Sequence, residues 1–247
     1  MHNLSVVLVR PRFPENIGMV ARAMANMGAT DLVLVRPERW EKEKAAPLAT
    51  PQGEELLDRA RVEEDLESAL ASCVAAFGAT ARTGGWRRTL LSPEQAAREA
   101  RGITRQGERV ALVFGSEDRG LLNTEVEQCT RLVNIPTVSG HSSLNLAQAA
   151  MVLLYECVKA DMALPFPGSG RKWTRPATGS DSRLATLAEE SLLLRTLEET
   201  LLAIGHLPQD NPGWFMQPMR RFIRKNRLRR HEFDMLMGIC RQIKRPS

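Results

Sequence analysis

Residues 132–154 read LVNIPTVSGHSSLNLAQAAMVLL, an apolar run, a polar loop and a longer apolar pattern. The first run predicts a strand over residues 132–135, which ends at Pro136 because proline has no N–H to donate to a sheet. Apolar residues then recur every three or four positions, which predicts a helix capped by Ser142 or Ser143. The apolar positions of that helix are Leu146, Ala149, Ala150, Leu153 and Leu154. The stretch therefore predicts a strand, a loop and a buried helix.

Two amide side chains, Asn145 and Gln148, stand near the start of this helix, whose pattern is otherwise that of a buried element. Open α/β sheets bind ligands at the carboxyl ends of their strands, beside the free N–H groups of the following helix. The pattern therefore predicts a small-ligand site at this loop without identifying the ligand. A strand, loop and helix without a site is the simpler alternative.

The composition indicates a folded chain without a membrane span. The 247 residues are 43% apolar, enough for one large core with an appendage. No apolar run approaches the roughly 20 residues that cross a bilayer, and residues 1–4 show no secretory pattern. The cysteines and the four histidines are scattered, so we expect reduced core thiols and no metal site. These features favour a cytoplasmic protein. The cysteines are Cys73, Cys129, Cys157 and Cys240.

Positive charge is concentrated at the end of the chain. The net charge is only +5, but residues 219–247 hold ten Lys or Arg against Glu232 and Asp234. The remainder of the chain is therefore slightly acidic. A basic block at one end is typical of a protein that binds a polyanion.

The first forty residues predict a βαβ unit. Residues 5–9 form a β-branched strand pattern, and residues 32–35 form a second strand pattern. Between them Pro14 begins a helix whose apolar face ends at Gly28, a residue that readily takes the left-handed cap conformation. Two strands joined by a helix in about thirty residues lie parallel with a right-handed crossover.

The middle of the chain predicts further helices and strands. We expect a charged loop over residues 40–53, an amphipathic helix over 54–71 and a strand over 73–77. A glycine-rich basic turn over 78–88 and a helix over 93–101 follow. The turn contains neither G-x-G-x-x-G nor a Walker lysine, which argues against a dinucleotide fold and a P-loop enzyme.

A buried strand pattern over residues 110–114 leads directly into the loop GSEDRGL at 115–121, and a short helix ending at Cys129 follows. Glu117 and Asp118 are adjacent in this loop, and adjacent side chains usually point apart. They are therefore a weak candidate for the paired carboxylates of a glycosidase.

Three segments together carry a family resemblance. They are residues 14–24 (PENIGMVARAM), residues 113–121 (VFGSEDRGL), and Ile135–Pro136 with residues 142–147 (SSLNLA). In this order they resemble the three motifs of the SpoU branch of the SPOUT RNA methyltransferases. The resemblance covers Ser5 to about residue 160, and it is strongest with the tRNA 2′-O-methyltransferases that act on the anticodon loop.

The resemblance implies an α/β fold with a mostly parallel sheet, flanking helices and a trefoil knot near the C-terminal end of the sheet. It also implies a homodimer whose active site is completed across the interface. Residues 17–27 and 144–158 are compatible with this, since both predict helices that are apolar over much of their surface. A symmetric partner subunit would bury the second apolar side of these helices. The alternative is that the helices are buried on all sides within one chain.

The resemblance further implies S-adenosylmethionine as the methyl donor. The positions that match its binding residues are Ala79, Thr80, Ala81, Gly115, Ile135, Ser142, Ser143 and Leu144. Small residues suit such contacts because they allow close approach of the backbone. The positions that match catalytic residues are Asn16, Arg22, Glu117, Ser143 and Asn145.

Methyl transfer to a ribose hydroxyl needs aligned reactants and a more nucleophilic oxygen. Arg22 would stabilise the developing alkoxide or hold a phosphate, while Asn16, Glu117 and Asn145 orient it and the sugar. A general-base role for Arg22 would require an unusually low pKa and is less favoured. Arg22 lies six residues after Asn16, about 240° around a helix, so a solvated surface charge is the alternative for it.

The composition shifts beyond about residue 160. Residues 163–183 read as a Pro/Gly/Ser linker, and residues 184–247 as a small basic helical extension. Its helices are expected over residues 184–204, 218–226 and 231–243. Its expected core residues, in preference to a base-stacking role, are Phe222, Ile223, Phe233, Leu236 and Ile239. Its arginines are expected to contact RNA phosphates.

We therefore expect a methyltransferase domain over residues 1–162, followed by the linker and the RNA-binding extension. The implied function is S-adenosylmethionine-dependent 2′-O-methylation of tRNA at cytidine or uridine 32, the first nucleotide of the anticodon loop. A ribosomal RNA 2′-O-methyltransferase and a non-catalytic RNA-binding protein on the same fold are the alternatives. The expected partners are tRNA and a second copy of the chain, with no metal and no membrane.

Overall fold

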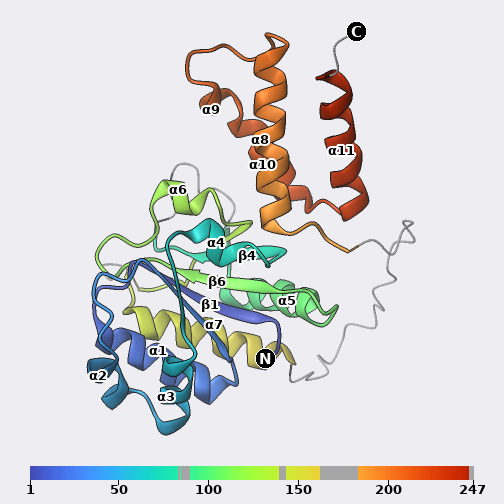
Figure 1. Ribbon diagram of the computed structural model, residues 1–247. Helices are drawn as coiled ribbons and strands as arrows, with labels where there is room; N and C mark the ends of the chain where they lie inside the picture. The colour runs from blue at the N-terminus through green and yellow to red at the C-terminus, as the bar shows by residue number, and fades with distance from the viewer. Residues whose placement is uncertain (83, 85–89, 139–142, 162–182, 245–247) are drawn as a thin grey trace.

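The computed structural model describes residues 1–82, 84, 90–138, 143–161 and 183–244. Their strands form one parallel sheet in the order β3-β2-β1-β6-β4-β7-β5 (Figure 1). The strand bounds are β1 Leu4–Val9, β2 Asp31–Val35, β3 Arg61–Glu63, β4 Ala75–Ala79, β5 Leu90–Leu91, β6 Val110–Phe114 and β7 Arg131–Val133. The predicted α/β class with a parallel sheet is confirmed.

The helices alternate with these strands. The N-terminal part contains α1 Pro14–Met27, α2 Lys42–Ala45, the 3₁₀ turn η1 Ala46–Leu48, α3 Pro51–Asp58, α4 Leu66–Leu70, α5 Pro93–Thr104, α6 Asn123–Val126 and α7 Leu146–Asp161. The C-terminal part contains α8 Leu187–Ala203, α9 Pro212–Phe215, α10 Gln217–Asn226 and α11 Arg230–Ile243.

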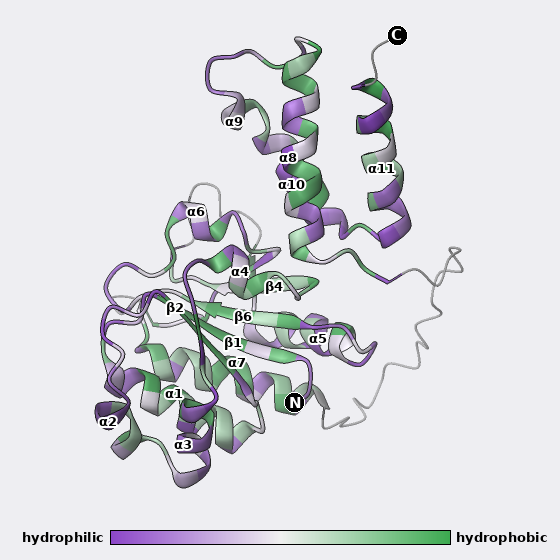
Figure 2. Cartoon of the chain, in the orientation of Figure 1, coloured by the Kyte–Doolittle hydropathy of each residue, from purple (hydrophilic) through white to green (hydrophobic). Residues whose placement is uncertain are grey.

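Side chains of the central strands alternate between two buried layers, as the period of two in a strand requires. Val6 and Leu8 of β1 face the larger layer, which holds α1, α5 and α7 (Figure 1). Val7 and Val9 face the other layer, which contains α4. Figure 2 shows that the central strands are hydrophobic along most of their length. Burial on both faces explains why these strands read as continuous apolar runs.

Helix α1 packs against other helices of the same chain on two sides. It packs against α7 on one side and against α2, η1 and α3 on another. Gly18 makes the approach to α2 possible, because a Cβ at this position would lie 2.0 Å from the Ala45 carbonyl oxygen. Its all-round apolar pattern therefore has an explanation inside one chain, and this pattern by itself does not require a second copy.

Two sequence predictions in the region after β2 are wrong. Residues 40–53, expected as a loop, contain α2, η1 and the start of α3, whose cap Thr50 accepts from the Gly53 N–H at 3.3 Å. Residues 54–71, expected as one helix, are two short helices with β3 between them. A new helix, α4, begins after Asp65, which caps it by accepting from the Ser68 N–H at 2.7 Å. The β3 segment is a strand because it pairs with β2. The sequence predicted a helix there because the charged stretch has helical periodicity.

The C-terminal helices form a small module with its own core. Its buried apolar residues are Ala185, Leu193, Leu194, Leu207, Met216, Ile223, Leu228 and Phe233. Ile223 and Phe233 are in the core as predicted, and Leu236 packs partly against it. Phe222 and Ile239, also predicted as core, are instead 62% and 49% exposed.

This module is attached to the second layer of the sheet. Leu187 is part of that layer's core, and its N–H donates to the Cys73 carbonyl at 2.8 Å. Ion pairs join Arg195 to Glu67 at 2.8 Å and Arg227 to Glu99. The start of α8 therefore completes the cover of the sheet.

The knot and the linker remain predictions. Residues 139–142 and 162–182, on which they depend, lie outside the described residues. All four cysteines are buried thiols outside any disulfide bond, as expected. Among the described helices, none combines the length and the apolar character that crossing a bilayer would demand.

Candidate functional site

A pocket of about 280 Å³ opens at the carboxyl ends of β4, β6 and β7, beside the start of α7. Its walls come from the loops that follow these three strands and from the first turn of α7. Its volume is close to the lower end of the range for small-molecule sites, roughly 300–1,000 Å³. The strand-to-helix loop after β7 thus borders a pocket, as the sequence pattern predicted.

The pocket brings together residues from distant parts of the sequence. Seven of the residues matched to cofactor binding line it: Ala79, Thr80, Ala81, Gly115, Ile135, Ser143 and Leu144. Ser142, the eighth, lies outside the described residues. Apolar lining also comes from Phe114, Leu121, Val133, Leu146 and Ala149. One wall therefore suits an apolar ring, and the backbone of the loops supplies polar groups.

The loops around the pocket are fastened to one another. The Thr80 N–H donates to the Val133 carbonyl at 2.9 Å, and the Asn134 side-chain amide donates to the Thr80 carbonyl at 2.9 Å. The loop after β6 turns back on itself, with the Gly120 N–H donating to the Ser116 carbonyl at 2.7 Å. Gly115 is required there, because a Cβ would lie 2.1 Å from the Gly120 carbonyl carbon. These bonds fix the pocket's shape without a ligand.

A chain of side-chain hydrogen bonds joins the three sequence motifs. The Asn145 Nδ2 donates to Asn16 Oδ1 at 3.0 Å, and the Asn16 Nδ2 donates to Glu117 Oε1 at 2.7 Å. The direction of the chain is fixed by its two ends. Glu117 as a carboxylate only accepts. Asn145 must present its oxygen to helix α7, where it accepts from the Ala147 N–H at 2.9 Å.

Asn145 is therefore the cap of α7. This corrects the prediction that Ser142 or Ser143 would cap this helix. The Asn145 oxygen also accepts from the Gln148 N–H at 3.4 Å, so it satisfies two of the N–H groups at the start of the helix. Ser143 is exposed at the pocket wall instead. The cap and the link to Asn16 use opposite ends of the same amide.

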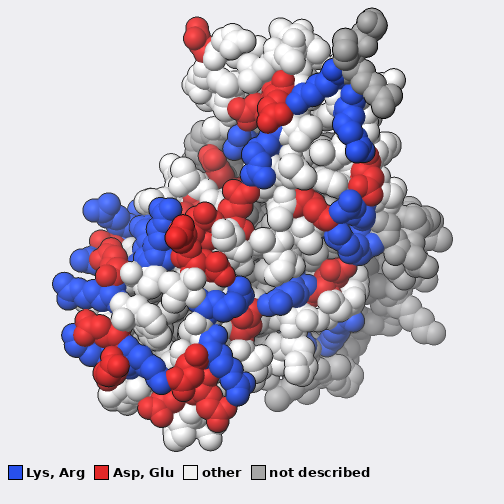
Figure 3. Space-filling model, viewed as in Figure 1, with Lys and Arg blue, Asp and Glu red and all other residues white. Residues whose placement is uncertain are grey.

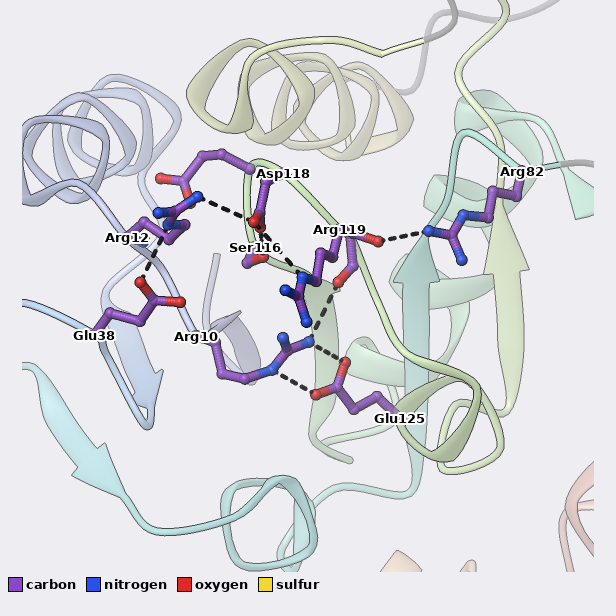
Figure 4. Close-up of polar contacts among 10 residues, drawn as sticks. Arg10, Arg12, Glu38, Arg82, Ser116, Asp118, Arg119 and Glu125 are labelled. Atoms are coloured by element: carbon purple, nitrogen blue, oxygen red, sulfur yellow. Dashed lines mark hydrogen bonds and ion pairs between the residues drawn. The ribbon is translucent and has the colours of Figure 1, made fainter.

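Arg12, which the sequence analysis did not single out, holds both carboxylates of the loop after β6. Its backbone N–H donates to Glu117 Oε2 at 3.0 Å, and its guanidinium pairs with Asp118 at 3.0 Å and Glu38 at 3.1 Å (Figure 4). The Ser116 hydroxyl donates to Asp118 at 2.6 Å. This hydroxyl first, and then the Arg12 guanidinium, hold the pKa of the Asp118 carboxyl below its ordinary value. Glu117 and Asp118 therefore bind different groups of Arg12, its backbone N–H and its guanidinium.

Arg10 is the second residue that the sequence analysis missed. Its Nε and one terminal nitrogen bind the two oxygens of Glu125 at 2.9 and 2.8 Å, and the same terminal nitrogen reaches the Gly120 carbonyl at 3.3 Å (Figure 4). Such a two-nitrogen fork is the strong form of a carboxylate bond. Arg10 has a left-handed backbone (φ 52°) at the end of β1. Its position at the carboxyl end of a strand that the sequence predicts is the feature that could have identified Arg10 as a site residue.

Arg22 lies apart from this cluster. Helix α1 begins at Pro14, so Asn16 is already inside the regular helix and Arg22 projects from another side of it. Asn16 is buried, whereas Arg22 is exposed, and its guanidinium binds no other group of the described residues. The structure thus brings Asn16, Glu117 and Asn145 together and leaves Arg22 at the surface.

The chemistry available at the pocket is that of positioning and charge. No histidine or cysteine is among its described lining residues, and no cluster of metal ligands occurs in the described part of the chain. Carboxylates line it at Glu117 and Asp118, with Arg82 and Arg119 beside them. Arg82 donates to the Arg119 carbonyl at 3.1 Å, which ties the loops after β4 and β6 (Figure 4). The described lining therefore carries side chains of both charges.

Known proteins share this architecture over the whole chain. Residues 3–155 match the SpoU rRNA Methylase family, and residues 189–247 match the C-terminal domain of the tRNA methyltransferase TrmJ. A tRNA (cytidine/uridine/adenosine-2′-O-)-methyltransferase TrmJ of Pseudomonas aeruginosa is 36% identical over 97% of this chain and 93% of its own length. A tRNA (cytidine/uridine-2′-O-)-methyltransferase TrmJ of Salmonella typhimurium is 33% identical over 100% of this chain and 98% of its own.

A solved structure gives the same result. The crystal structure of TrmJ from Z. mobilis superposes with a TM-score of 0.80 at 30% identity, covering 98% of this chain and 99% of that one. The two family matches lie on either side of the region predicted as a linker. The chain therefore belongs to the SpoU methylases and, within them, to the TrmJ family of tRNA 2′-O-methyltransferases.

Proposed function

We propose that this enzyme transfers a methyl group from S-adenosylmethionine to the ribose 2′-hydroxyl of cytidine or uridine 32 in tRNA. The observation that carries the proposal is the link from Asn145 through Asn16 to Glu117 at the edge of a pocket. The three residues come from three separate segments, and a purely structural pocket does not need their joint alignment. The relatives' activity on tRNA supports the choice of substrate.

The pocket fits S-adenosylmethionine by its chemistry. The apolar wall, with Val133, Ile135 and Leu144, suits an adenine ring, and the loop carboxylates suit a ligand with cationic groups. The loop backbones after β4 and β7 carry the polar groups that would hold the rest of the molecule. When bound, the sulfonium supplies an electrophilic methyl group. The residues that would hold the donor are those matched in the sequence, including Ala79, Thr80, Ala81 and Gly115.

The chain's own residues would align and activate the acceptor. Glu117 is fixed by the Asn16 amide and the Arg12 N–H, so its position is set before substrate arrives. Asn145 and Ser143, on the other side of the pocket, are exposed and available to the ribose. Prealigned groups of this kind lower the barrier mainly by positioning. A guanidinium would then stabilise the developing alkoxide or hold the adjacent phosphate.

Arg22 supplies that guanidinium in our proposal, from a second copy of the chain. Within one chain its exposed side chain lies away from the pocket cluster. A two-fold dimer would place the Arg22 of one subunit at the pocket of the other, so each active site would need both subunits. The outer side of α7, which carries the exposed Tyr155, offers part of the contact surface. The proposed dimer uses the methyltransferase domain, residues 1–162.

The C-terminal module, residues 184–247, serves in this proposal as the RNA-binding part, joined by the linker over 163–183. Several of its cations are already paired. Arg220 binds Glu198 at 3.1 Å, Arg230 binds Asp234 at 3.0 Å, and Lys244 binds Glu199 at 2.8 Å. Figure 3 shows acidic and basic side chains side by side over the viewed face. Fewer cations are therefore available to phosphates than the sequence count suggests.

The decisive experiment supplies the purified chain with radiolabelled S-adenosylmethionine and, in separate reactions, tRNA transcripts or ribosomal RNA fragments. We expect label in a transcript with cytidine 32 or uridine 32 and none when that nucleotide carries a 2′-deoxyribose. Label that persists in the deoxy transcript would place the methyl group elsewhere. Label only in ribosomal RNA fragments would favour the ribosomal alternative.

A further inference from the structure

The outer surface of α9 and α10 carries a concentration of exposed aromatic side chains. Aromatic residues make up only 5% of the chain. Three of them, Trp214, Phe215 and Phe222, lie within nine residues and are 59%, 47% and 62% exposed. Trp214 and Phe215 meet edge to face with ring centroids 4.9 Å apart. A cluster of exposed rings in a folded module indicates a binding surface.

The helical geometry brings these rings together. Met216, between α9 and α10, keeps right-handed helical torsion angles (φ −77°, ψ −12°), and the Arg220 N–H donates to its carbonyl at 2.9 Å. Phe215, Met219 and Phe222 are spaced four and three residues apart, the spacing of one helix face. All three are exposed, whereas Met216 and Ile223, about 90° around the helix axis, are buried. The rings therefore form one outward surface.

Lys and Arg side chains flank this aromatic surface, and the segment that carries it contains no acidic residue. Residues 211–231 contain seven Lys or Arg and no Asp or Glu. The structure divides these cations. Arg220 and Arg227 turn inward to Glu198 and Glu99, whereas the Lys225 side chain is exposed beside the aromatic surface. This charge is complementary to a polyanion and unsuited to an apolar protein partner.

We propose that Trp214, Phe215 and Phe222 form a stacking platform for unpaired bases of the RNA, with Lys225 beside it for the adjoining phosphate. The inference rests on the proposed function and specifies how its RNA is held. Single-stranded nucleotides stack on exposed aromatic rings whatever their sequence, because every base has a π-face. An RNA with an unpaired loop can present such bases, whereas a continuous duplex cannot.

Salt dependence separates stacking from phosphate binding. The affinity of full-length chain for a tRNA transcript and for a single-stranded oligonucleotide is measured by fluorescence anisotropy at several salt concentrations. We expect Phe222→Ala and Trp214→Ala to weaken binding by about 5- to 100-fold each. The slope of log K against log salt should stay unchanged, because no phosphate contact is lost. Lys225→Gln should instead flatten that slope.

Matched variants test the aromatic character of the surface. Phe222→Tyr keeps a ring and should bind as the wild type does, whereas Phe222→Leu keeps apolar area without a ring and should bind as weakly as Phe222→Ala. Met235→Ala, on α11, removes a side chain that is 58% exposed and should change nothing. The melting temperature of each variant should stay at the wild-type value because these side chains lie outside the core.

Three outcomes would overturn the proposal. Wild-type affinity in Phe222→Leu would mean a simple apolar contact. A change in sedimentation of Phe222→Ala, with dissociation of the wild-type assembly, would assign the surface to a second copy of the chain. Absence of RNA binding by the wild type would remove the platform's ligand. By contrast, a wild type that binds RNA but transfers no methyl group contradicts the proposed function and leaves the platform intact.

Discussion

Asn16 in α1 donates its side-chain amide to Glu117 in the loop after β6, at 2.7 Å between Nδ2 and Oε1. These residues are 101 positions apart in the sequence. The bond is possible because β1 and β6 are adjacent in the sheet, so the segments that follow them begin at the same edge. Asn145 then joins from the start of α7. The sheet topology thus assembles the three motifs into one hydrogen-bonded unit.

The substitution Asn145→Asp separates the two roles of this side chain. A carboxylate caps a helix as well as an amide does and interacts favourably with its N-terminus. However, it has no N–H to donate to Asn16. We expect the melting temperature to stay within about 2 °C of the wild type while the methyl transfer rate falls at least tenfold. Asn145→Ala should lose both rate and about 1 kcal/mol of stability. Equal rates in Asn145→Asp and the wild type would show that the link to Asn16 is dispensable.

Mixing experiments test the proposed contribution of Arg22 across a dimer. Arg22→Ala should abolish methyl transfer while cofactor affinity stays within a few-fold and stability is unchanged, since the side chain is exposed. Asn16→Ala should also be inactive. If each site uses Arg22 of one subunit and Asn16 of the other, mixed dimers contain one intact site. Activity should then reappear when the two variants are refolded together. No recovery in verified mixed dimers would restrict both residues to the same chain.

Arg10 is expected to control cofactor affinity through the loop that it holds. Arg10→Lys keeps the charge but loses the fork that binds both oxygens of Glu125 and reaches Gly120. The loop over residues 115–121 lines the pocket, so its displacement should weaken S-adenosylhomocysteine binding about tenfold, equivalent to about 1.4 kcal/mol. Calorimetry measures this directly. The control is Arg98→Lys, whose exposed side chain pairs with Glu94 on the same helix, α5. Equal weakening in both variants would point to a general effect of arginine loss.

Glu190 should make the chain's stability depend on pH. It is 1% exposed, and no hydrogen bond to its side-chain oxygens is found among the described residues. Burial raises the pKa of its carboxyl to about 7, although the nearby Arg224 acts to lower it. A raised pKa in the folded state means that folding favours the protonated acid. This contribution to stability is complete below pH 4.5, the ordinary pKa. It is lost as the pH rises to about 7.

Glu190→Gln tests this dependence, because an amide of the same shape cannot ionise. We expect the variant to match the wild type near pH 4.5 and to exceed its free energy of unfolding at pH 8 by about 3 kcal/mol. Urea titrations at the two pH values measure the difference. The control is Glu199→Gln on the same helix, where the exposed carboxylate binds Lys244 and its loss should not stabilise. A constant difference between Glu190→Gln and the wild type at all pH values would contradict the assignment.

The sequence by itself determined the elements whose ends carry strong local signals. Helix α1 begins at Pro14 and is capped by Gly28 (φ 72°), as predicted, because proline fixes φ at a helix start and glycine readily takes the left-handed cap conformation. The buried strands β1, β2 and β6 were evident from their apolar runs. The motif residues Asn16, Glu117 and Asn145 were also identified from the sequence, since the resemblance rests on short contiguous segments.

Only the tertiary structure decided which distant groups meet and which face outward. The fork between Arg10 and Glu125 joins residues 115 positions apart, and no local periodicity encodes such a pair. The exposure of Phe222 follows from the direction in which α10 packs on α8, which an apolar residue in a helix cannot specify alone. Arg22 likewise points away from Asn16 because the helix begins before both residues. Local sequence sets backbone conformation within a few residues, whereas burial depends on the partners that the whole fold supplies.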